Sequence, residues 1–213
     1  MIEQTEGTSL LSLLFKGGWV MLPILMLSIM ALYAILERLI VLYKTIRVPR
    51  MWLESINAQL IAGDLQSVQV LCEGKSYALA KIMQAGIERL KAPNKVFKTA
   101  VENAAQQEVY KLEKNLALLG TIASAAPMMG FLGTVLGMIQ AFMAMAQQTQ
   151  QISPKLLSGG IYEAMVTTAA GLVVGIIANL GYNYLLIRIQ KATQHLEQGA
   201  NQFIELVENY STH

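Results

Sequence analysis

The chain alternates between long apolar stretches and polar stretches with helical periodicity. Residues 17 to 36 carry no charge, and a stretch of this length forms about 30 Å of helix, enough to cross a bilayer. Two more apolar stretches follow at 119–146 and 154–187. The polar stretch before them has its apolar residues at helical spacing and is interrupted by Pro and Gly. This pattern predicts an all-α, polytopic membrane protein with three transmembrane helices.

The ends of the apolar stretches predict the organisation of the chain. Residues 94–119 contain no helix breaker, so we expect one very long helix that starts at Asn94, includes the second span and is kinked near Pro127. Both the second and the third span should extend into the cytoplasm. The expected segments are 1–18 (outer or interfacial N-terminus), 19–43 (first span), 44–118 (cytoplasmic helical domain), 119–146 (second span), 147–153 (periplasmic loop), 154–187 (third span) and 188–213 (cytoplasmic C-terminal helix).

Charged residues predict the orientation of the chain in the membrane. Of the 16 Lys and Arg residues, 11 lie between Lys44 and Lys114, whereas the opposite side carries only Lys16 and Lys155. The positive-inside rule therefore places the N-terminus on the outer side of the membrane and the large loop and the C-terminus on the inner side. Residues 8–16 are either a short interfacial helix or an apolar lead-in to the first span, and both interpretations stay open.

Composition argues against several function classes. Only 14% of the residues are charged and the net charge is +2, which gives no basic surface for nucleic acid. Cys72 is the single cysteine, and both histidines, His195 and His213, lie near the C-terminus. These residues give no metal-binding framework and place no histidine in the spans. We therefore expect a protein that is not an enzyme, with no catalytic residue, metal site or cofactor.

Small residues recur at helical spacing in the second and third apolar stretches. In lipid, such a stripe lets helix backbones approach closely. It is most often a packing seam between helices, and it can also line a pore. The residues expected to pack are Pro127, Gly130, Gly133, Gly137, Gly171 and Gly175.

A few polar residues lie within these apolar stretches. Glu163 is either a polar group on an ion path or an acid close enough to the outer interface to stay hydrated. Thr134, Thr167 and Thr168 are either functional hydroxyls or structural residues that bond to their own helix. Glu163 and Thr167 are four residues apart and share a helix face.

Two strings in the sequence resemble the signature segments of a known family. They are P-x-x-G-x-x-G-T-V at Pro127–Val135 and E-A…T-A…G-L at Glu163–Leu172, and Tyr182-Asn183 closes the third span. Both are similar to segments of the proton-channel subunits typified by ExbB and TolQ, with the flagellar stator subunit MotA more distant. Two departures are visible: Gly159 stands where many relatives have proline, and Ile176-Ile177 replaces an Ile-Pro step.

The resemblance implies a bacterial inner-membrane protein that forms a homo-oligomeric ring, generally a pentamer, whose second and third spans line a pore. An ExbD/TolR-like single-span partner with an intramembrane aspartate would occupy that pore, and a TonB- or TolA-like protein would receive the work. Thr134, Thr168 and Glu163 would be the pore-lining polar residues. The implied function is a proton channel of the ExbB–ExbD (TonB) type that uses the proton motive force to energise outer-membrane transport. A TolQ-type subunit of the Tol–Pal system and a passive membrane scaffold are the alternatives, and the scarcity of acids favours protons over sodium.

Overall fold

The computed structural model of the chain describes residues 17–46, 48–90, 92–147 and 154–211. Every regular element in these ranges is an α-helix, and three of the helices are long and apolar enough to cross a membrane. This confirms the prediction of an all-α membrane protein with three spans. Most of the expected N-terminal segment and of the expected periplasmic loop lies outside the described residues.

The helices divide between two compact units. Unit 1 comprises Met1–Ile35 and Ala117–Asn183, and unit 2 comprises Leu36–Leu116 and Tyr184–His213. The helices are α2 (Met21–Ile46), α3 (Arg50–Ala62), α4 (Leu65–Cys72), α5 (Ala78–Ile87), α6 (Asn94–Glu113), α7 (Leu116–Ala146) and α8 (Pro154–Ser211).

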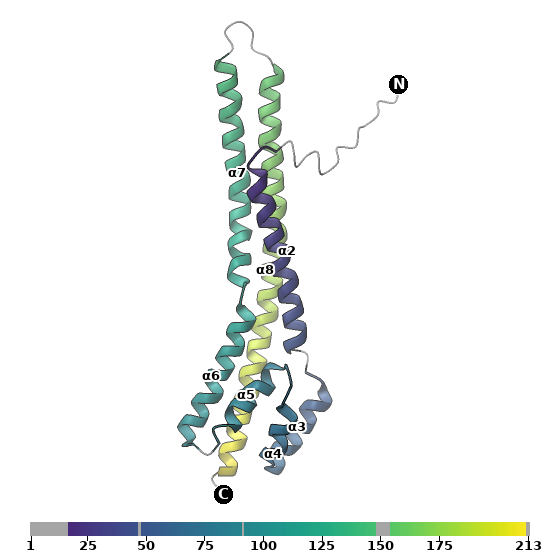
Figure 1. Cartoon of the computed structure of the whole chain (residues 1–213), viewed down its shortest axis with the longest axis vertical. Helices are drawn as coiled ribbons and strands as arrows, with labels where there is room; N and C mark the ends of the chain where they lie inside the picture. Colours follow the sequence, from purple (N-terminus) through teal and green to yellow (C-terminus); the bar gives the residue numbers. More distant parts are fainter. Residues whose placement is uncertain (1–16, 47, 91, 148–153, 212–213) are drawn as a thin grey trace, which may run out of the picture. The chain divides into compact units, whose positions relative to one another are not determined.

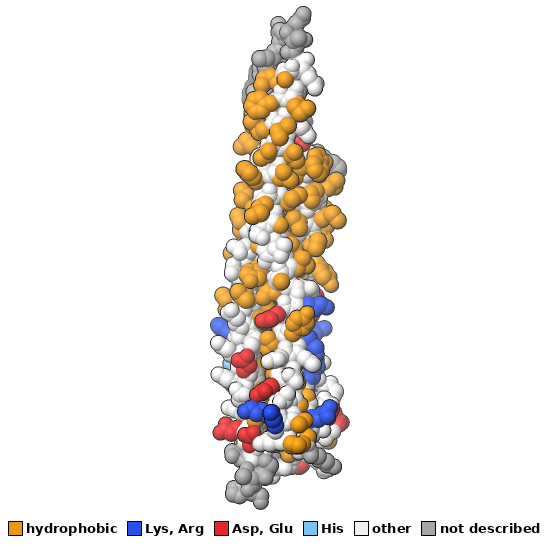
Figure 2. Space-filling view, turned by 90° about the vertical axis from the view of Figure 1, so that its left-hand side faces the viewer, with side chains coloured by type: hydrophobic (Ala, Val, Ile, Leu, Met, Phe, Trp, Pro, Cys, Tyr) orange, Lys and Arg blue, Asp and Glu red, His pale blue; other side chains and the backbone are white. Residues whose placement is uncertain are grey.

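Unit 1 is built from α7, α8 and the first half of α2, which lie side by side (Figure 1). Val20, Met21 and Ile24 are buried where the chain enters α2. They pack against partly buried side chains of α7 and α8, namely Met129, Leu136, Ala170 and Val174. The visible face of unit 1 is covered largely by hydrophobic side chains (Figure 2). Such a surface suits contact with lipid chains.

In unit 2, α5 and α6 pack against the second half of α8, and α4 contacts α3 and α5. Phe203 of α8 is fully buried, and its ring centre lies 5.7 Å from that of Phe97 in α6. Other apolar positions of the C-terminal tail, Leu196, Ile204 and Val207, are also buried. The tail is therefore amphipathic, and its apolar face forms the core of this unit.

The long helix expected from Asn94 through the second span is interrupted. Helix α6 ends at Glu113 and α7 begins at Leu116, and Asn115 between them has a φ angle of 63°. Asparagine tolerates this left-handed conformation better than most residues do. The prediction of a single helix was therefore wrong, and Pro127 lies inside the continuous α7.

Two charged residues of α2 stabilise this break. Arg38 is only 3% exposed, and its Nη1 donates to the carbonyl oxygens of Lys111 at 2.7 Å and Leu112 at 3.3 Å. These carbonyls lie at the end of α6, where helix carbonyls have no partner within the helix. The carboxylate of Glu37 accepts from Arg38 at 3.0 Å and from the Asn115 amide at 2.8 Å. The contact that favours the break thus comes from a distant part of the sequence.

Candidate functional site

Helices α7 and α8 contact each other through their small residues. A Cβ atom placed on Gly171 would lie 2.6 Å from the carbonyl oxygen of Ala126 and 2.8 Å from Cα of Gly130. A Cβ atom placed on Gly130 would lie 3.1 Å from Cα of Thr168. Distances below 3.0 Å essentially never occur for real Cβ atoms. The two backbones are therefore in direct contact, as small residues permit in lipid.

The same contact continues along the pair of helices. Gly175 lies against the ring of Pro127, and a Cβ atom there would lie 3.2 Å from the carbonyl oxygen of Ala123. That carbonyl is the one that Pro127 leaves without its usual helical donor.

Further along the contact, Gly133 faces the side chain of Thr167. A Cβ atom on Gly137 would lie 3.0 Å from Cβ of Ala164. The six residues expected to pack helices all lie at this contact within one chain, and a pore-lining role for the stripe stays a prediction.

Three threonines lie along the contact, and their hydroxyl groups have different partners. Thr168 Oγ1 donates across the contact to the carbonyl oxygen of Gly130 at 2.9 Å. Thr134 and Thr167 donate within their own helices, to the carbonyl oxygens of Phe131 at 2.6 Å and Ala164 at 2.8 Å. Thr134 and Thr168 are half-buried, whereas Thr167 is 2% exposed. Of these three hydroxyl groups, therefore, that of Thr168 forms a hydrogen bond between the two helices.

Glu163 lies beside the turn that leads into α2. A Cβ atom on Gly18 would overlap a carboxylate oxygen of Glu163, and Gly18 has a φ angle of 66°. Thr167 lies one helical turn after Glu163 in α8, and its side chain is near Gly17, which precedes Gly18 in the turn before α2. Glu163 is thus half-buried at the level where α2 begins at Met21. This is the position that the interfacial interpretation of Glu163 requires, and its role in a pore stays a prediction.

Glu163 and Thr168 lie on different faces of α8. At 3.6 residues per turn, Glu163 is about 40° from Thr167 around the helix but about 140° from Thr168. Asn179 follows Thr168 by eleven residues, which is close to three turns, and Asn183 follows one turn later. The face that carries Thr168 therefore continues as a line of neutral amide side chains.

An open groove of about 590 Å³ lies on α7 and α8 near these amides. Its polar lining is formed by Thr121, Ser124, Asn179 and Tyr182. The Asn183 amide donates to Asn179 Oδ1 at 3.1 Å. The sequence pattern did not single out Thr121, Ser124 or Asn179, whose side chains are of types readily satisfied within their own helix. The eleven-residue spacing from Thr168 to Asn179 is the signal that could have identified this face.

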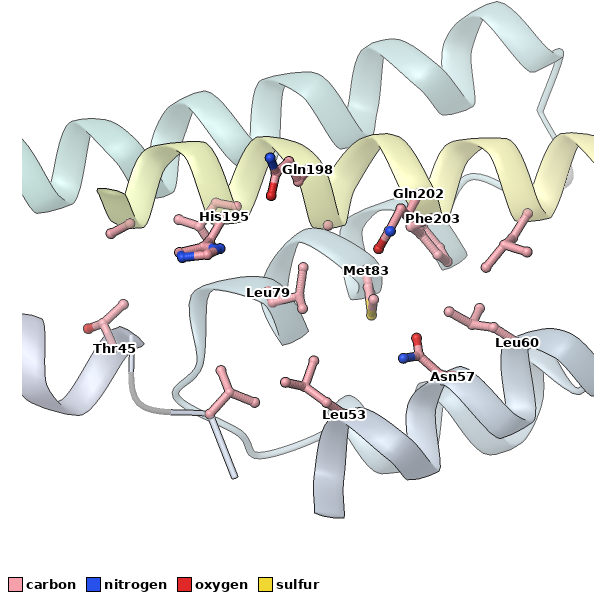
Figure 3. A pocket seen from close by; sticks show the side chains of 15 residues that line it. Thr45, Leu53, Asn57, Leu60, Leu79, Met83, His195, Gln198, Gln202 and Phe203 are labelled. Atoms are coloured by element: carbon pink, nitrogen blue, oxygen red, sulfur yellow. The ribbon is translucent and has the colours of Figure 1, made fainter. Parts of the chain in front are cut away.

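Unit 2 contains a cavity of about 330 Å³ between α3, α5 and α8. Figure 3 shows His195, Gln198 and Gln202 approaching it from α8 and Asn57 from α3. A single histidine among amides offers no paired groups for acid–base or nucleophilic catalysis. Within the ranges that the structure describes, no cluster of His, Cys, Asp and Glu could hold a metal ion.

The profile of the MotA/TolQ/ExbB proton channel family matches residues 75–198, which are 124 of the 213 residues. The match includes the whole contact between α7 and α8. The chain belongs to this family. Its signature strings are therefore the segments that form the helix contact, and Gly130, Thr168 and Gly171 lie at its centre.

Individual family members are similar over much of the chain. The protein named ExbB-like 1 of Synechocystis is 30% identical over 95% of this chain and 80% of its own length. The biopolymer transport protein exbB1 of Vibrio cholerae is 32% identical over 62% of this chain and 60% of its own. The Tol-Pal system protein TolQ of Haemophilus influenzae is 32% identical over 65% of this chain and 58% of its own length.

Family membership and three apolar helices identify a membrane protein and point to the bacterial inner membrane. The MotA/TolQ/ExbB family is known for channel and motor components rather than for enzymes. Relatives with both ExbB and TolQ names support a role in this family, and these names leave the choice between the TonB and Tol–Pal systems open.

Proposed function

We propose that the protein is the ring-forming subunit of an ExbB–ExbD (TonB) type motor, which uses the proton motive force to energise outer-membrane transport. Five copies surround the intramembrane helix of an ExbD/TolR-like partner, and a TonB-like protein receives the work. The N-terminus lies in the periplasm, and segments 44–118 and 188–213 lie in the cytoplasm. The subunit carries out no enzymatic reaction.

The observation that carries this proposal is the chemistry of the Thr168 face. Glu163 is the sole acid in the second and third apolar stretches, and it lies on another face beside Gly18. The Thr168 face offers only neutral hydrogen-bonding groups, from Thr168 to Asn179 and Asn183. A wall of this kind suits a channel in which the titrating carboxylate belongs to a partner helix. Because neutral groups can hydrate a path without fixing a charge, they leave the proton to that carboxylate.

The hydrogen bond that Thr168 already makes limits which groups of a partner it can bind. Its single hydroxyl proton is donated to Gly130, so the oxygen has only acceptor capacity left. An acceptor can bind a protonated carboxylic acid but has no proton to offer an ionised carboxylate. Thr134 is in the same condition because its proton is donated to Phe131. We therefore infer that both hydroxyls favour the protonated form of the partner's aspartate when it faces them.

Glu163 has a different part in the proposal. Its carboxylate lies at the level where α2 begins, which is the outer end of the first span in the proposed orientation. An acid at the mouth of a path raises the local concentration of cations, including protons. We infer that Glu163 attracts protons to the path and that Thr134 and Thr168 form its narrower part.

The test replaces each threonine by valine, which has nearly the same shape but no hydroxyl. We expect Thr168→Val to lower proton-driven work about tenfold, since a hydrogen bond contributes about 1–1.5 kcal/mol. Thr134→Val should have a smaller effect. The measurement is energised uptake in cells that lack the native copy, together with pull-down of the partner.

Two matched variants control this test. Thr167→Val removes a hydroxyl that is bonded within its own helix on a residue only 2% exposed, so it cannot face a path and its loss should leave activity near normal. Thr168→Ser keeps the hydroxyl and should restore most of the activity. Near-normal activity in Thr168→Val with an assembled complex would refute the assignment of the path to this face.

A TolQ-type subunit of the Tol–Pal system is the second candidate. The similarity to the Haemophilus TolQ equals that to the Vibrio exbB1 protein in identity, at 32%, and covers slightly more of this chain. Expression in strains that lack either the ExbB or the TolQ subunit distinguishes the two. Rescue of TonB-dependent uptake supports the first candidate, and rescue of envelope integrity alone supports the second.

A further inference from the structure

A second groove in unit 2 combines basic and aromatic side chains. It has a volume of about 450 Å³ and lies between the last part of α2 and the part of α8 that follows Tyr184. One side of the groove is apolar and the other is polar or cationic. It is lined by Leu39, Leu42, Tyr43, Tyr184, Arg188, Lys191, Ala192 and His195.

The guanidinium group of Arg188 is held in a fixed place in this groove. Its Nε and Nη2 donate to the hydroxyl oxygen of Tyr184 at 3.2 and 3.1 Å, and its central carbon lies 5.4 Å from the centre of the Tyr184 ring. These bonds use two of the five N–H donors of arginine. Three donors remain for a ligand, in the fork that suits phosphate oxygens.

The groove has cations without a nearby counter-ion. Among the residues that the structure describes, no carboxylate lies within ion-pair distance of Arg188 or Lys191, and both side chains are exposed. The two residues are three positions apart and share a helix face. The pair therefore presents two positive charges to the same space, which favours an anionic ligand.

The groove lies where two apolar stretches give way to charge. The apolar stretch of α2, which is interrupted by Glu37 and Arg38, ends just before Lys44, and that of α8 ends at Ile187, just before Arg188. Tyrosine is enriched at this level of membranes, and Tyr43 and Tyr184 both line the groove. Basic pockets between membrane helices at this depth suit anionic lipid head groups.

We propose that this groove binds the phosphate of an anionic phospholipid. Arg188 and Lys191 bind the phosphate oxygens, and the acyl chains lie along Leu39 and Leu42. A soluble phosphate compound would leave the apolar side uncovered, whereas a lipid covers both sides. The proposal concerns a lipid site and does not depend on the transported ion or on the client of the motor.

The test uses the full chain, purified with its partner from membranes and placed in nanodiscs of equal parts phosphatidylglycerol and phosphatidylcholine. Transfer to lipid-free detergent follows, and the lipids retained per chain are measured by mass spectrometry. We expect preferential retention of phosphatidylglycerol. In Arg188→Gln/Lys191→Gln the preference should fall about fivefold for each cation removed, since each contributes about 1 kcal/mol.

Two double variants serve as controls. Lys95→Gln/Lys114→Gln removes the same charge from exposed positions outside the groove and should keep the preference. Arg188→Lys/Lys191→Arg keeps both charges and should also keep it, which separates loss of binding from loss of folding. Equal retention in the wild type and in Arg188→Gln/Lys191→Gln would overturn the proposal.

Two further measurements test the identity of the ligand. Glycerol phosphate, added as a soluble competitor, should leave the bound phosphatidylglycerol in place. Full displacement by this competitor would assign the groove to a soluble anion and refute the lipid site. A disulfide between copies through Tyr184→Cys in lipid bilayers would refute it as well, because a second copy would then cover the groove.

Discussion

Replacing Gly171 by alanine should loosen the pair of helices that carries the candidate path. The new Cβ atom would lie 2.6 Å from the carbonyl oxygen of Ala126, which belongs to backbone and cannot rotate away. A carbon–oxygen contact settles at about 3.3 Å, so the helices must separate locally by about 0.7 Å. The hydroxyl of Thr168, now 2.9 Å from the Gly130 carbonyl oxygen, would then lose its partner.

The expected cost follows from these contacts. Overpacking costs about 1–3 kcal/mol, and the lost hydrogen bond adds about 1 kcal/mol. The better helix propensity of alanine returns up to about 1 kcal/mol. We therefore expect Gly171→Ala to lower the free energy of unfolding by about 2 kcal/mol. The measurement is unfolding of the purified protein in mixed micelles, followed by circular dichroism.

Gly159→Ala is the matched control because it makes the same chemical change in the same helix. Among the residues that the structure describes, a Cβ atom on Gly159 would meet nothing within 4 Å. This variant should therefore be neutral or slightly stabilised through helix propensity. Unfolding of Gly171→Ala at the same denaturant concentration as Gly159→Ala, or at a higher one, would show that a Cβ atom at Gly171 does not disturb the helix contact.

Three further predictions concern single side chains. Glu163→Ala should impair energised uptake with little change in expression, and unchanged uptake would leave this acid as a hydrated interfacial residue. Burial raises the pKa of the Cys72 thiol from 9.0 to about 11. Alkylation at pH 8 should then be about 100-fold slower in the folded than in the unfolded chain. Between pH 9 and pH 11 the thiol ionises in the unfolded chain before it does in the folded one, so the free energy of unfolding should fall over this range. Arg38→Gln should cost about 3 kcal/mol of stability and increase trypsin cleavage at Lys114, whereas Lys98→Gln should change neither.

The sequence predicted the elements whose cause is local. Apolar stretches long enough to span a bilayer predicted α2, α7 and the first part of α8. Glycines such as Gly130 and Gly171 predicted a close helix contact because small residues at regular helical spacing let helix backbones approach closely in lipid. These inferences need only the identity of neighbouring residues.

The break between α6 and α7 could not be predicted in this way. Nothing near Asn115 forces a helix to end, and the carbonyls freed there find their donor in Arg38, more than 70 residues earlier. The approach of Gly18 to Glu163 is equally non-local. The pattern of neighbouring residues does not predict such contacts between distant residues, because these contacts depend on which helices come together.

The burial of the glycine stripe also limits what can line a pore. Gly130, Gly133 and Gly171 are covered by the partner helix of the same chain, so they offer no surface to an ion or to another protein. Any path along α7 and α8 must therefore use residues beside the stripe, such as the half-buried Thr168. Substitutions at Gly171 and at Thr168 then separate two properties that the sequence motif combines. The first changes the helix contact, and the second changes the hydrogen bonding available to a protonated partner.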